Sequence, residues 1–238
     1  MDTEPTPAVV PFLHAVTNDE IVSRANFLDR ARTVMRASGE RGALQLRAPR
    51  MAHRDSSKFV ELALTLAEEQ ARTGAWLVVN DRLDVALIVC ARGVQLTARS
   101  LDVADAVRVL LERAAECGAD PNAAIGASLH SLEEGIAARL AGATWGVVGD
   151  VLAAHASPAD EVNPSRSTNG SGPALLERLV RFSGLPIVAI GGIVPQHVAP
   201  LRRVGVRGVA AIRGIWDADD SERAVTDYLS AYDSEVGR

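Results

Sequence analysis

Short apolar runs alternate along this chain with longer stretches in which apolar residues recur every three or four positions. The runs are rich in valine, isoleucine, leucine and alanine, which is typical of strands buried on both faces of a parallel sheet. They predict eight strands, at residues 12–16, 43–47, 76–79, 93–96, 123–127, 144–148, 185–190 and 208–212. Each predicted strand is followed by a segment in which the apolar residues have helical spacing. This order favours a (β/α)8 TIM barrel of the α/β class, with a doubly wound sheet as the alternative.

The strand and helix pattern fills nearly the whole chain. At 238 residues the length suits a single barrel domain, which we expect at 11–238 behind a flexible N-terminal tail at 1–10. One long irregular segment interrupts the pattern after the sixth strand, at about 149–172, and it is rich in Ser, Pro, Asn, Asp and Gly. A loop of this length in a compact domain is usually functional or disordered.

Charge and hydropathy exclude several classes of partner. The net charge of −5 argues against a nucleic-acid or anionic-membrane surface. No stretch approaches 18 apolar residues, and the acidic N-terminus lacks an apolar signal core, so we expect a cytoplasmic protein. Lys58 is the only lysine, so the positive charge is almost entirely arginine. A mechanism that needs an active-site lysine elsewhere is therefore excluded.

Polar residues and glycines gather at the predicted carboxyl ends of the strands, where the active site of such a barrel lies. The set suits a small phosphorylated substrate that undergoes proton transfer. Its members are Thr17, Asn18, Asp19, Gln45, Arg47, Asn80, Asp81, Gln95, Ser128, His130, Gly149, Asp150, Gly191, Gly192, Arg213 and Gly214.

Glycines follow the last two strands and form a candidate phosphate cup, Gly191, Gly192 and Gly214. Without a Cβ they let backbone N–H groups approach an anion, although they could also serve only as tight turns. Arg213 lies beside Gly214. It could strengthen phosphate binding, or block the cup by pairing with Asp150 or Asp19.

Three further residues are candidates for chemistry. His130 precedes a predicted capping box of Ser131 and Glu134, where it could act as general acid or base or remain a surface histidine. Asp81 could bind a metal, position a ligand hydroxyl, or cap the short helix that follows. Arg47 ends an apolar strand, where a lone charge usually has an anionic partner. His14, within the first strand, is expected to be a packed core residue.

Six motifs, in order along the chain, resemble the thiamine phosphate synthase/TenI superfamily. They are Leu13–Asp19, Leu46-Arg47, Val79–Leu87, Gly93–Leu96, Ile125–Glu134 and Ala189–Ile193. The resemblance implies a (β/α)8 barrel of thiamin biosynthesis that commonly self-associates. Its synthase branch joins a pyrimidine pyrophosphate to a thiazole phosphate with Mg²⁺. Its TenI branch isomerises a carboxylated thiazole phosphate without a metal, and there the histidine that matches His130 moves the proton.

Departures from the synthase pattern favour the TenI branch. Where synthases carry Arg-Glu-Lys after the second strand, this chain has Arg47-Ala48-Pro49. Ser100 stands where synthases have a second metal-binding aspartate, with Asp102 only nearby, so Asp81 alone remains of the metal pair. The loop after the sixth strand lacks the synthase lysine.

We therefore expect a thiazole tautomerase that needs no cofactor and acts on a small phosphorylated thiazole. In this hypothesis His130 transfers the proton, and Gly191, Gly192, Arg213 and Gly214 bind phosphate. Arg47 binds the substrate carboxylate, and the remaining substrate contacts come from Asn80, Asp81, Gln95 and Ser128. Two alternatives remain. One is a thiamine phosphate synthase with Mg²⁺ on Asp81, and the other is a non-catalytic paralogue that binds a thiamin-pathway ligand.

Overall fold

The computed structural model describes residues 9–117, 123–152 and 172–234. Within them eight parallel strands form a closed barrel, in which each strand pairs with its neighbours in chain order and β8 pairs with β1. The strands are β1 (Leu13–Val16), β2 (Gly42–Leu46), β3 (Trp76–Asn80), β4 (Gly93–Leu96), β5 (Ala124–Leu129), β6 (Trp145–Val148), β7 (Ile187–Ile190) and β8 (Gly208–Ala211). The predicted (β/α)8 barrel is confirmed. The doubly wound sheet is excluded, because an open sheet has two edge strands, whereas here every strand pairs with a neighbour on both sides.

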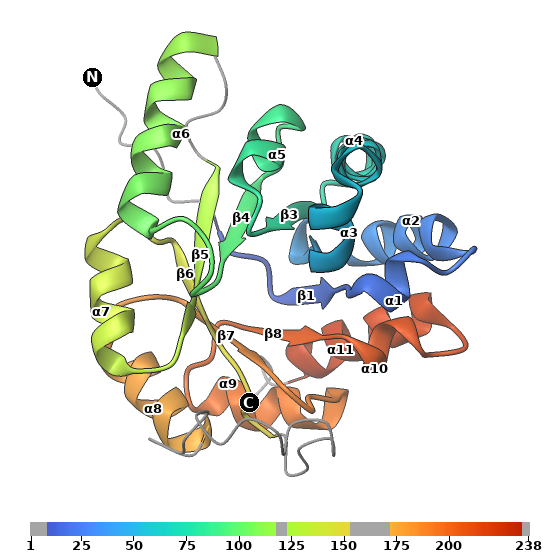
Figure 1. Ribbon diagram of the computed structural model, residues 1–238. Coiled ribbons are helices and arrows are strands. Elements are labelled where there is room, and N and C mark those ends of the chain that lie inside the picture. The colour runs from blue at the N-terminus through green and yellow to red at the C-terminus, as the bar shows by residue number, and fades with distance from the viewer. Residues whose placement is uncertain (1–8, 118–122, 153–171, 235–238) are drawn as a thin grey trace, which may run out of the picture.

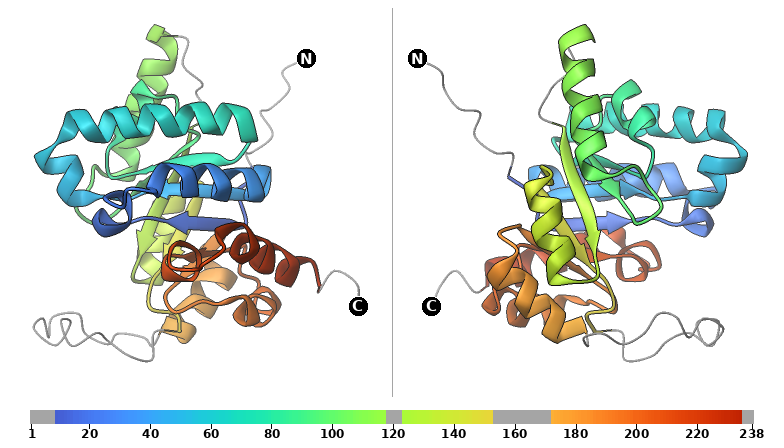
Figure 2. Two further views of the ribbon diagram at one scale, coloured as in Figure 1. Left: turned by 90° about the vertical axis from the view of Figure 1, so that its right-hand side faces the viewer. Right: turned by 60° about the vertical axis from the view of Figure 1, so that its left-hand side comes forward.

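Helices connect the strands and cover the outside of the barrel (Figure 1). They are α1 (Asp19–Val22), α2 (Phe27–Ser38), α3 (Pro49–Arg54), α4 (Ser56–Thr73), α5 (Leu83–Ile88), α6 (Val103–Cys117), α7 (Leu132–Leu140), α8 (Gly172–Phe182), α9 (Val198–Arg203), α10 (Arg213–Trp216) and α11 (Ser221–Asp233), with 3₁₀ turns η1 (Gly39–Arg41) and η3 (Pro195–His197). Helix α11 packs against α2 and α9, and the left view of Figure 2 shows α11 beside α2. The last helix thus closes the outer layer next to the first.

Side chains along each strand alternate between two apolar cores. On β3, Trp76 and Val78 belong to a cluster inside the barrel, whereas Leu77 and Val79 pack with the surrounding helices. This alternation follows from the two-residue period of a strand. It lets every strand be apolar on both faces, which explains the uninterrupted apolar runs in the sequence.

His14 lies inside the barrel and is 1% exposed. Its Nε2 is 3.2 Å from the carbonyl oxygen of Pro11, and its Nδ1 has no hydrogen-bond partner in the described part of the chain. Burial lowers the pKa of His14 to about 4, although the hydrogen bond to Pro11 acts in the opposite direction. The prediction of a packed core histidine is confirmed.

The connections after β1, β2 and β8 show local detail that the spacing of apolar residues does not record. After β1, the helical segment is divided into α1 and α2, and Ala25 is exposed between them. After β2, α3 begins at Pro49, because proline at the first helical position needs no N–H donor. Arg213 lies between β8 and Gly214 as expected, and it is the first residue of α10.

The predicted tail and long loop lie mostly outside the described residues, which omit 1–8 and 153–171. Val10, placed in the flexible tail by its position, is 3% exposed and joins the apolar cluster inside the barrel. After β6, the amides of Val151 and Leu152 donate to the carbonyl oxygens of Ile190 and Gly191. The start of the long loop therefore lies alongside the end of β7. Among the described helices, none has the length and apolar character needed to cross a membrane.

Candidate active site

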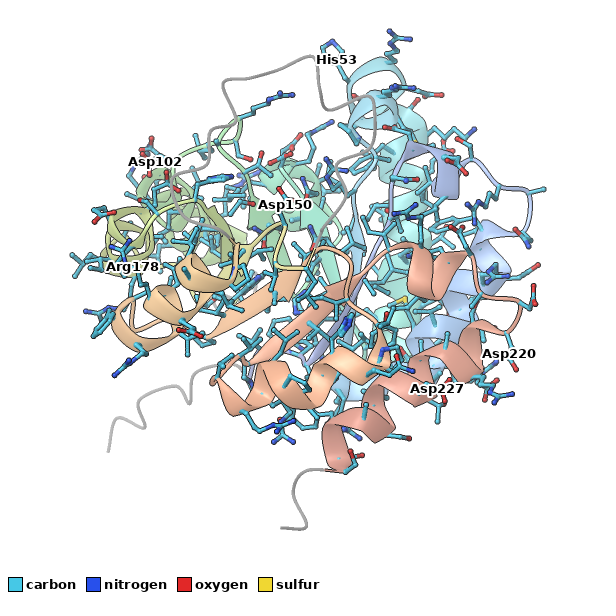
Figure 3. All side chains as sticks on the ribbon, turned by 90° about the horizontal axis from the view of Figure 1, so that it is seen from below. His53, Asp102, Asp150, Arg178, Asp220 and Asp227 are labelled. Atoms are coloured by element: carbon cyan, nitrogen blue, oxygen red, sulfur yellow. The ribbon has the colours of Figure 1, made fainter. Side chains whose placement is uncertain are left out.

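A cavity of about 590 Å³ opens at the carboxyl ends of β2, β3 and β4. It is lined by Arg47, Ala48, Pro49, Ala52, His53, Ser56, Asn80, Asp81, Arg82, Asp84 and Arg99. We call it the β2–β4 pocket. Figure 3 labels His53, on α3 at the edge of the view, and Asp150, which follows β6 nearer its middle. Three predicted site residues, Arg47, Asn80 and Asp81, come together in this pocket. The rule that the site lies at the carboxyl ends of the strands, here called the strand-end rule, therefore located it.

The carboxylate of Asp81 is held by donors from two neighbouring segments. Oδ1 accepts hydrogen bonds from the amide of Thr97 at 3.0 Å and its Oγ1 at 2.8 Å, and also from Oγ of Ser100. Oδ2 accepts from Nδ2 of Asn80 at 2.7 Å. These bonds compensate a left-handed backbone at Asp81, with φ of 62°. Helix α5 has no side-chain cap, so the alternative that Asp81 caps this helix is wrong.

Arg82 and Asp84 form a two-point ion pair on the wall of the pocket, at 2.8 and 2.6 Å. The hydrogen bond to Asp84 raises the pKa of Arg82, and the same contact lowers the pKa of Asp84. Arg82 also donates to the carbonyl oxygen of Ala52 at 2.9 Å. Both charges are thus satisfied within the protein, and the pair fastens α3 to the loop after β3.

Arg47 and Arg99 contribute guanidinium groups whose charge is not neutralised. Both residues are exposed, and within the described ranges neither side chain makes a hydrogen bond or ion pair. The backbone of Arg47 is fixed, because its N–H donates to Oγ1 of Thr17 at 2.9 Å and its carbonyl oxygen accepts from the same hydroxyl at 3.1 Å. The pocket therefore presents two available cations on an anchored rim.

A hydrogen-bonded layer lies inside the barrel below the pocket. Nε2 of Gln45 donates to Oδ1 of Asn80 at 2.7 Å. Nε1 of Trp145 donates to Oε1 of Gln95 at 2.9 Å, and Nε2 of Gln95 donates to Oγ of Ser128 at 3.2 Å. Gln95 is 1% exposed and does not line the pocket. Its side chain, predicted to contact substrate, supports Ser128 instead.

His130 lies at the end of β5, outside the β2–β4 pocket, and its side chain is 67% exposed. Ser131 caps α7 as predicted, accepting from the amide of Glu134 at 3.0 Å. Glu134 reaches back one residue further than the capping box predicts. Its Oε2 accepts from the amide of His130 at 2.7 Å and lies 3.2 Å from Nδ1 of the same residue. This contact orients an imidazole that is open to solvent.

The candidate phosphate cup of Gly191, Gly192 and Gly214, here called the glycine cup, lies at the ends of β7 and β8. Gly191 and Gly192 have φ of 117° and 66°, and their N–H groups have no partner among the described residues. Nor do the N–H groups of Arg213 and Gly214, at the start of α10. Tyr228 of α11 joins the two loops. Its hydroxyl donates to the carbonyl oxygen of Ile193 at 2.7 Å and would be 2.6 Å from a Cβ at Gly214.

Arg213 is exposed and forms no ion pair with Asp150 or Asp19 in the described structure. Oδ1 of Asp19 instead accepts from the amide of Met51 at 3.0 Å. The alternative in which Arg213 blocks the cup through one of these carboxylates is therefore wrong. Its guanidinium remains available to an anion.

The residues present do not fit the Mg²⁺ that the family resemblance implies for a synthase. Mg²⁺ in such sites is usually held by one or two carboxylates, substrate phosphates and water. Asp81 is surrounded by donors, which would oppose a cation, and the hydroxyl of Ser100 occupies its Oδ1. The described residues contain no group of three or more His, Cys, Asp or Glu that could hold a metal.

Sequence reasoning missed Arg82, Arg99 and Thr97 as parts of this site. Thr97 and Arg99 directly follow β4, so the strand-end rule could have included them. The family resemblance placed Ser100 at the position that pairs with Asp81 in synthases, in accord with their contact. Nothing in the sequence indicates that Thr97 bonds to Asp81, because that contact joins the loops of two different strands.

A family model described as thiamine monophosphate synthase matches residues 13–215. A thiamine-phosphate synthase of Methanoculleus marisnigri is 32% identical over 94% of this chain and 97% of its own length. The bifunctional protein ThiM/ThiE of Symbiobacterium thermophilum is 38% identical over 74% of this chain, which spans 34% of that relative. The solved thiamine phosphate pyrophosphorylase of Pyrococcus furiosus superposes with a TM-score of 0.71 at 24% identity, covering 95% of this chain and 97% of that one.

Proposed function

This chain belongs to the thiamine monophosphate synthase family, and on that premise we propose that it is a thiamine-phosphate synthase. The family predicted from the motifs is confirmed, which makes the protein an enzyme of thiamine biosynthesis. The relative of Methanoculleus marisnigri is named a thiamine-phosphate synthase, and that of Symbiobacterium thermophilum a bifunctional protein of thiamine biosynthesis. The expected preference for a TenI-type tautomerase gains no support from them, so the alternative of the sequence analysis becomes the leading proposal.

The observation that carries the proposal is the uncompensated positive charge of the β2–β4 pocket. A synthase binds two phosphorylated substrates, a diphosphate and a monophosphate, whereas a tautomerase binds one. Two separate regions at one end of the barrel have donors available to an anion, namely the pocket with Arg47 and Arg99 and the glycine cup with Arg213. Guanidinium groups suit diphosphate oxygens, and free backbone N–H groups suit a monophosphate.

The chemical step needs charge stabilisation more than proton transfer. The bond between the pyrimidine methylene carbon and a pyrophosphate oxygen breaks, and its electron pair leaves with pyrophosphate. The thiazole nitrogen donates its lone pair to the same carbon. Arg47 and Arg99 would stabilise the charge that develops on the leaving group, because guanidinium groups form charged hydrogen bonds to its phosphate oxygens. Asn80, Ser128 and Asp81 would orient the rings.

The direct test supplies both substrates to the purified protein. We expect thiamine phosphate and pyrophosphate to form in equal amounts, and Arg47→Gln to slow the reaction by about 10²-fold, the scale of a lost transition-state donor. Absence of both products at high enzyme concentration, with and without Mg²⁺, would contradict the proposal. Binding of thiazole phosphate under those conditions would point instead to the non-catalytic ligand-binding paralogue.

The contact between His130 and Glu134 favours a thiazole tautomerase as a second candidate function. Proton transfer requires a positioned acid or base and no metal, and this imidazole is both oriented and accessible. The test is conversion of carboxylated thiazole phosphate to its aromatic tautomer, with His130→Ala expected to lose roughly 10²–10⁴ in rate. Full activity of the variant would exclude His130 as the group that moves the proton.

A further inference from the structure

The charges of the β2–β4 pocket divide into satisfied and available groups. Arg82 and Asp84 neutralise each other through two short hydrogen bonds. The carboxylate of Asp81 accepts hydrogen bonds from Thr97, Ser100 and Asn80. That leaves the guanidinium groups of Arg47 and Arg99, from the loops after β2 and β4, without a partner among the residues described. The pocket thus has more guanidinium groups than carboxylates, and two of its guanidinium groups are available to an anionic ligand.

The neutral hydrogen-bond donors around Asp81 determine whether a metal ion or an arginine neutralises an anion in the pocket. A divalent metal needs carboxylate lone pairs, but here Oδ1 receives two hydroxyl donors and one amide. Displacing them would leave the amide and both hydroxyls without this acceptor, in a half-buried site where unmade hydrogen bonds are costly. The other carboxylate that lines the pocket, Asp84, is held by Arg82. The geometry therefore disfavours a metal at this point and leaves neutralisation of an anion to arginine.

We propose that the β2–β4 pocket is a metal-independent diphosphate site, in which Arg47 and Arg99 take the place of a divalent cation. Each guanidinium offers five N–H donors in a planar fork that matches phosphate oxygens. The volume of about 590 Å³ lies within the range of small-molecule sites and accommodates a diphosphate ester. The identity of the diphosphate ester rests on the proposed function, but the assignment of a diphosphate site to this pocket does not.

Calorimetric titration of the full-length protein with inorganic pyrophosphate in EDTA tests the site directly. We expect one pyrophosphate per chain to bind without metal. Arg47→Gln and Arg99→Gln should each weaken binding at least tenfold. Arg36→Gln is the matched control, because Arg36 is an exposed arginine of α2 away from the pocket, and it should bind like the wild type. Both pocket arginines are exposed, so their variants should unfold at the wild-type temperature.

A second pair of variants tests the position of the anion relative to Asp81. Ser100→Asp places another negative charge in the pocket and should weaken pyrophosphate binding in EDTA at least tenfold. Ser100→Ala removes only a hydroxyl and should change it less than threefold. Equal affinities for Ser100→Asp and the wild type would overturn the site. Pyrophosphate binding that appears only after Mg²⁺ is added would also overturn it, as would wild-type affinity in Arg99→Gln.

Turnover measured separately distinguishes this inference from the proposed function. If pyrophosphate binds in EDTA but the two thiamin precursors are not joined, the diphosphate site is supported and the synthase proposal fails. If they are joined only with Mg²⁺ and pyrophosphate does not bind in EDTA, the synthase is supported and the metal-independent site fails.

Discussion

Nε1 of Trp145 donates a 2.9 Å hydrogen bond to Oε1 of Gln95, and the pair fills the interior of the barrel between β4 and β6. Both residues are buried, at 0% and 1% exposure. The other end of the Gln95 amide donates to Ser128 on β5. Three strands are thus connected beneath the candidate active site by side chains, and the buried Trp145 and Gln95 must find their hydrogen-bond partners within the protein.

Trp145→Phe should lower the free energy of unfolding by about 1–3 kcal/mol, because Oε1 of Gln95 would be left buried without a donor. Urea denaturation followed by circular dichroism measures the change. Trp76→Phe is the control, as Trp76 lies in the same interior cluster without a hydrogen bond from its indole in the described structure. Equal losses in the two variants would assign the effect to lost volume alone.

Gly191→Ala should destabilise the protein by about 1–3 kcal/mol, because Gly191 has φ of 117° and a Cβ there would lie 2.9 Å from the Cα and N of Asp150. Differential scanning calorimetry provides the measurement. In Gly149→Ala, a Cβ would meet no atom within 4 Å, so that variant should unfold like the wild type. A stable Gly191→Ala protein would show that the loops after β6 and β7 can separate without cost.

His14 should make the protein sensitive to acid. Its pKa is about 4 in the folded state against 6.5 unfolded, so between these values the unfolded chain binds the extra proton. Stability is therefore complete above pH 6.5 and is lost as the pH falls towards 4, by about 3 kcal/mol in total. Urea midpoints at pH 7.5 and 4.5 should differ less in His14→Leu than in the wild type. The exposed His53→Leu should retain the wild-type difference.

Arg213→Gln tests whether this side chain serves the glycine cup. If the guanidinium contacts phosphate, KM for the thiazole phosphate should rise roughly 10–100-fold, as expected for the loss of a charged hydrogen bond. Stability should be unchanged, because Arg213 is exposed and makes no ion pair among the residues described. The matched control is Arg223→Gln, an exposed arginine of α11. An unchanged or lower KM in Arg213→Gln would remove Arg213 from phosphate binding.

The carboxyl ends of the strands were predictable from local sequence, and they located most of the candidate site. Arg47, Asn80 and Asp81 were identified because each ends or follows an apolar run, and all three line the β2–β4 pocket. The same rule placed Gln95 in the site, yet its side chain lies inside the barrel. A strand-end position specifies the end of the barrel but not whether a side chain points outward or into the interior core.

The sequence by itself determined the eight strands and the order of the helices, because the spacing of apolar residues reflects burial that each segment experiences locally. Only the tertiary structure decided that Arg47 and Arg99 share one pocket, and that Thr97 and Ser100 occupy the carboxylate of Asp81. These contacts join loops that are separate in the chain and adjacent only after β2, β3 and β4 pair. Closure of the barrel brings them together, and no local pattern records the distances that result.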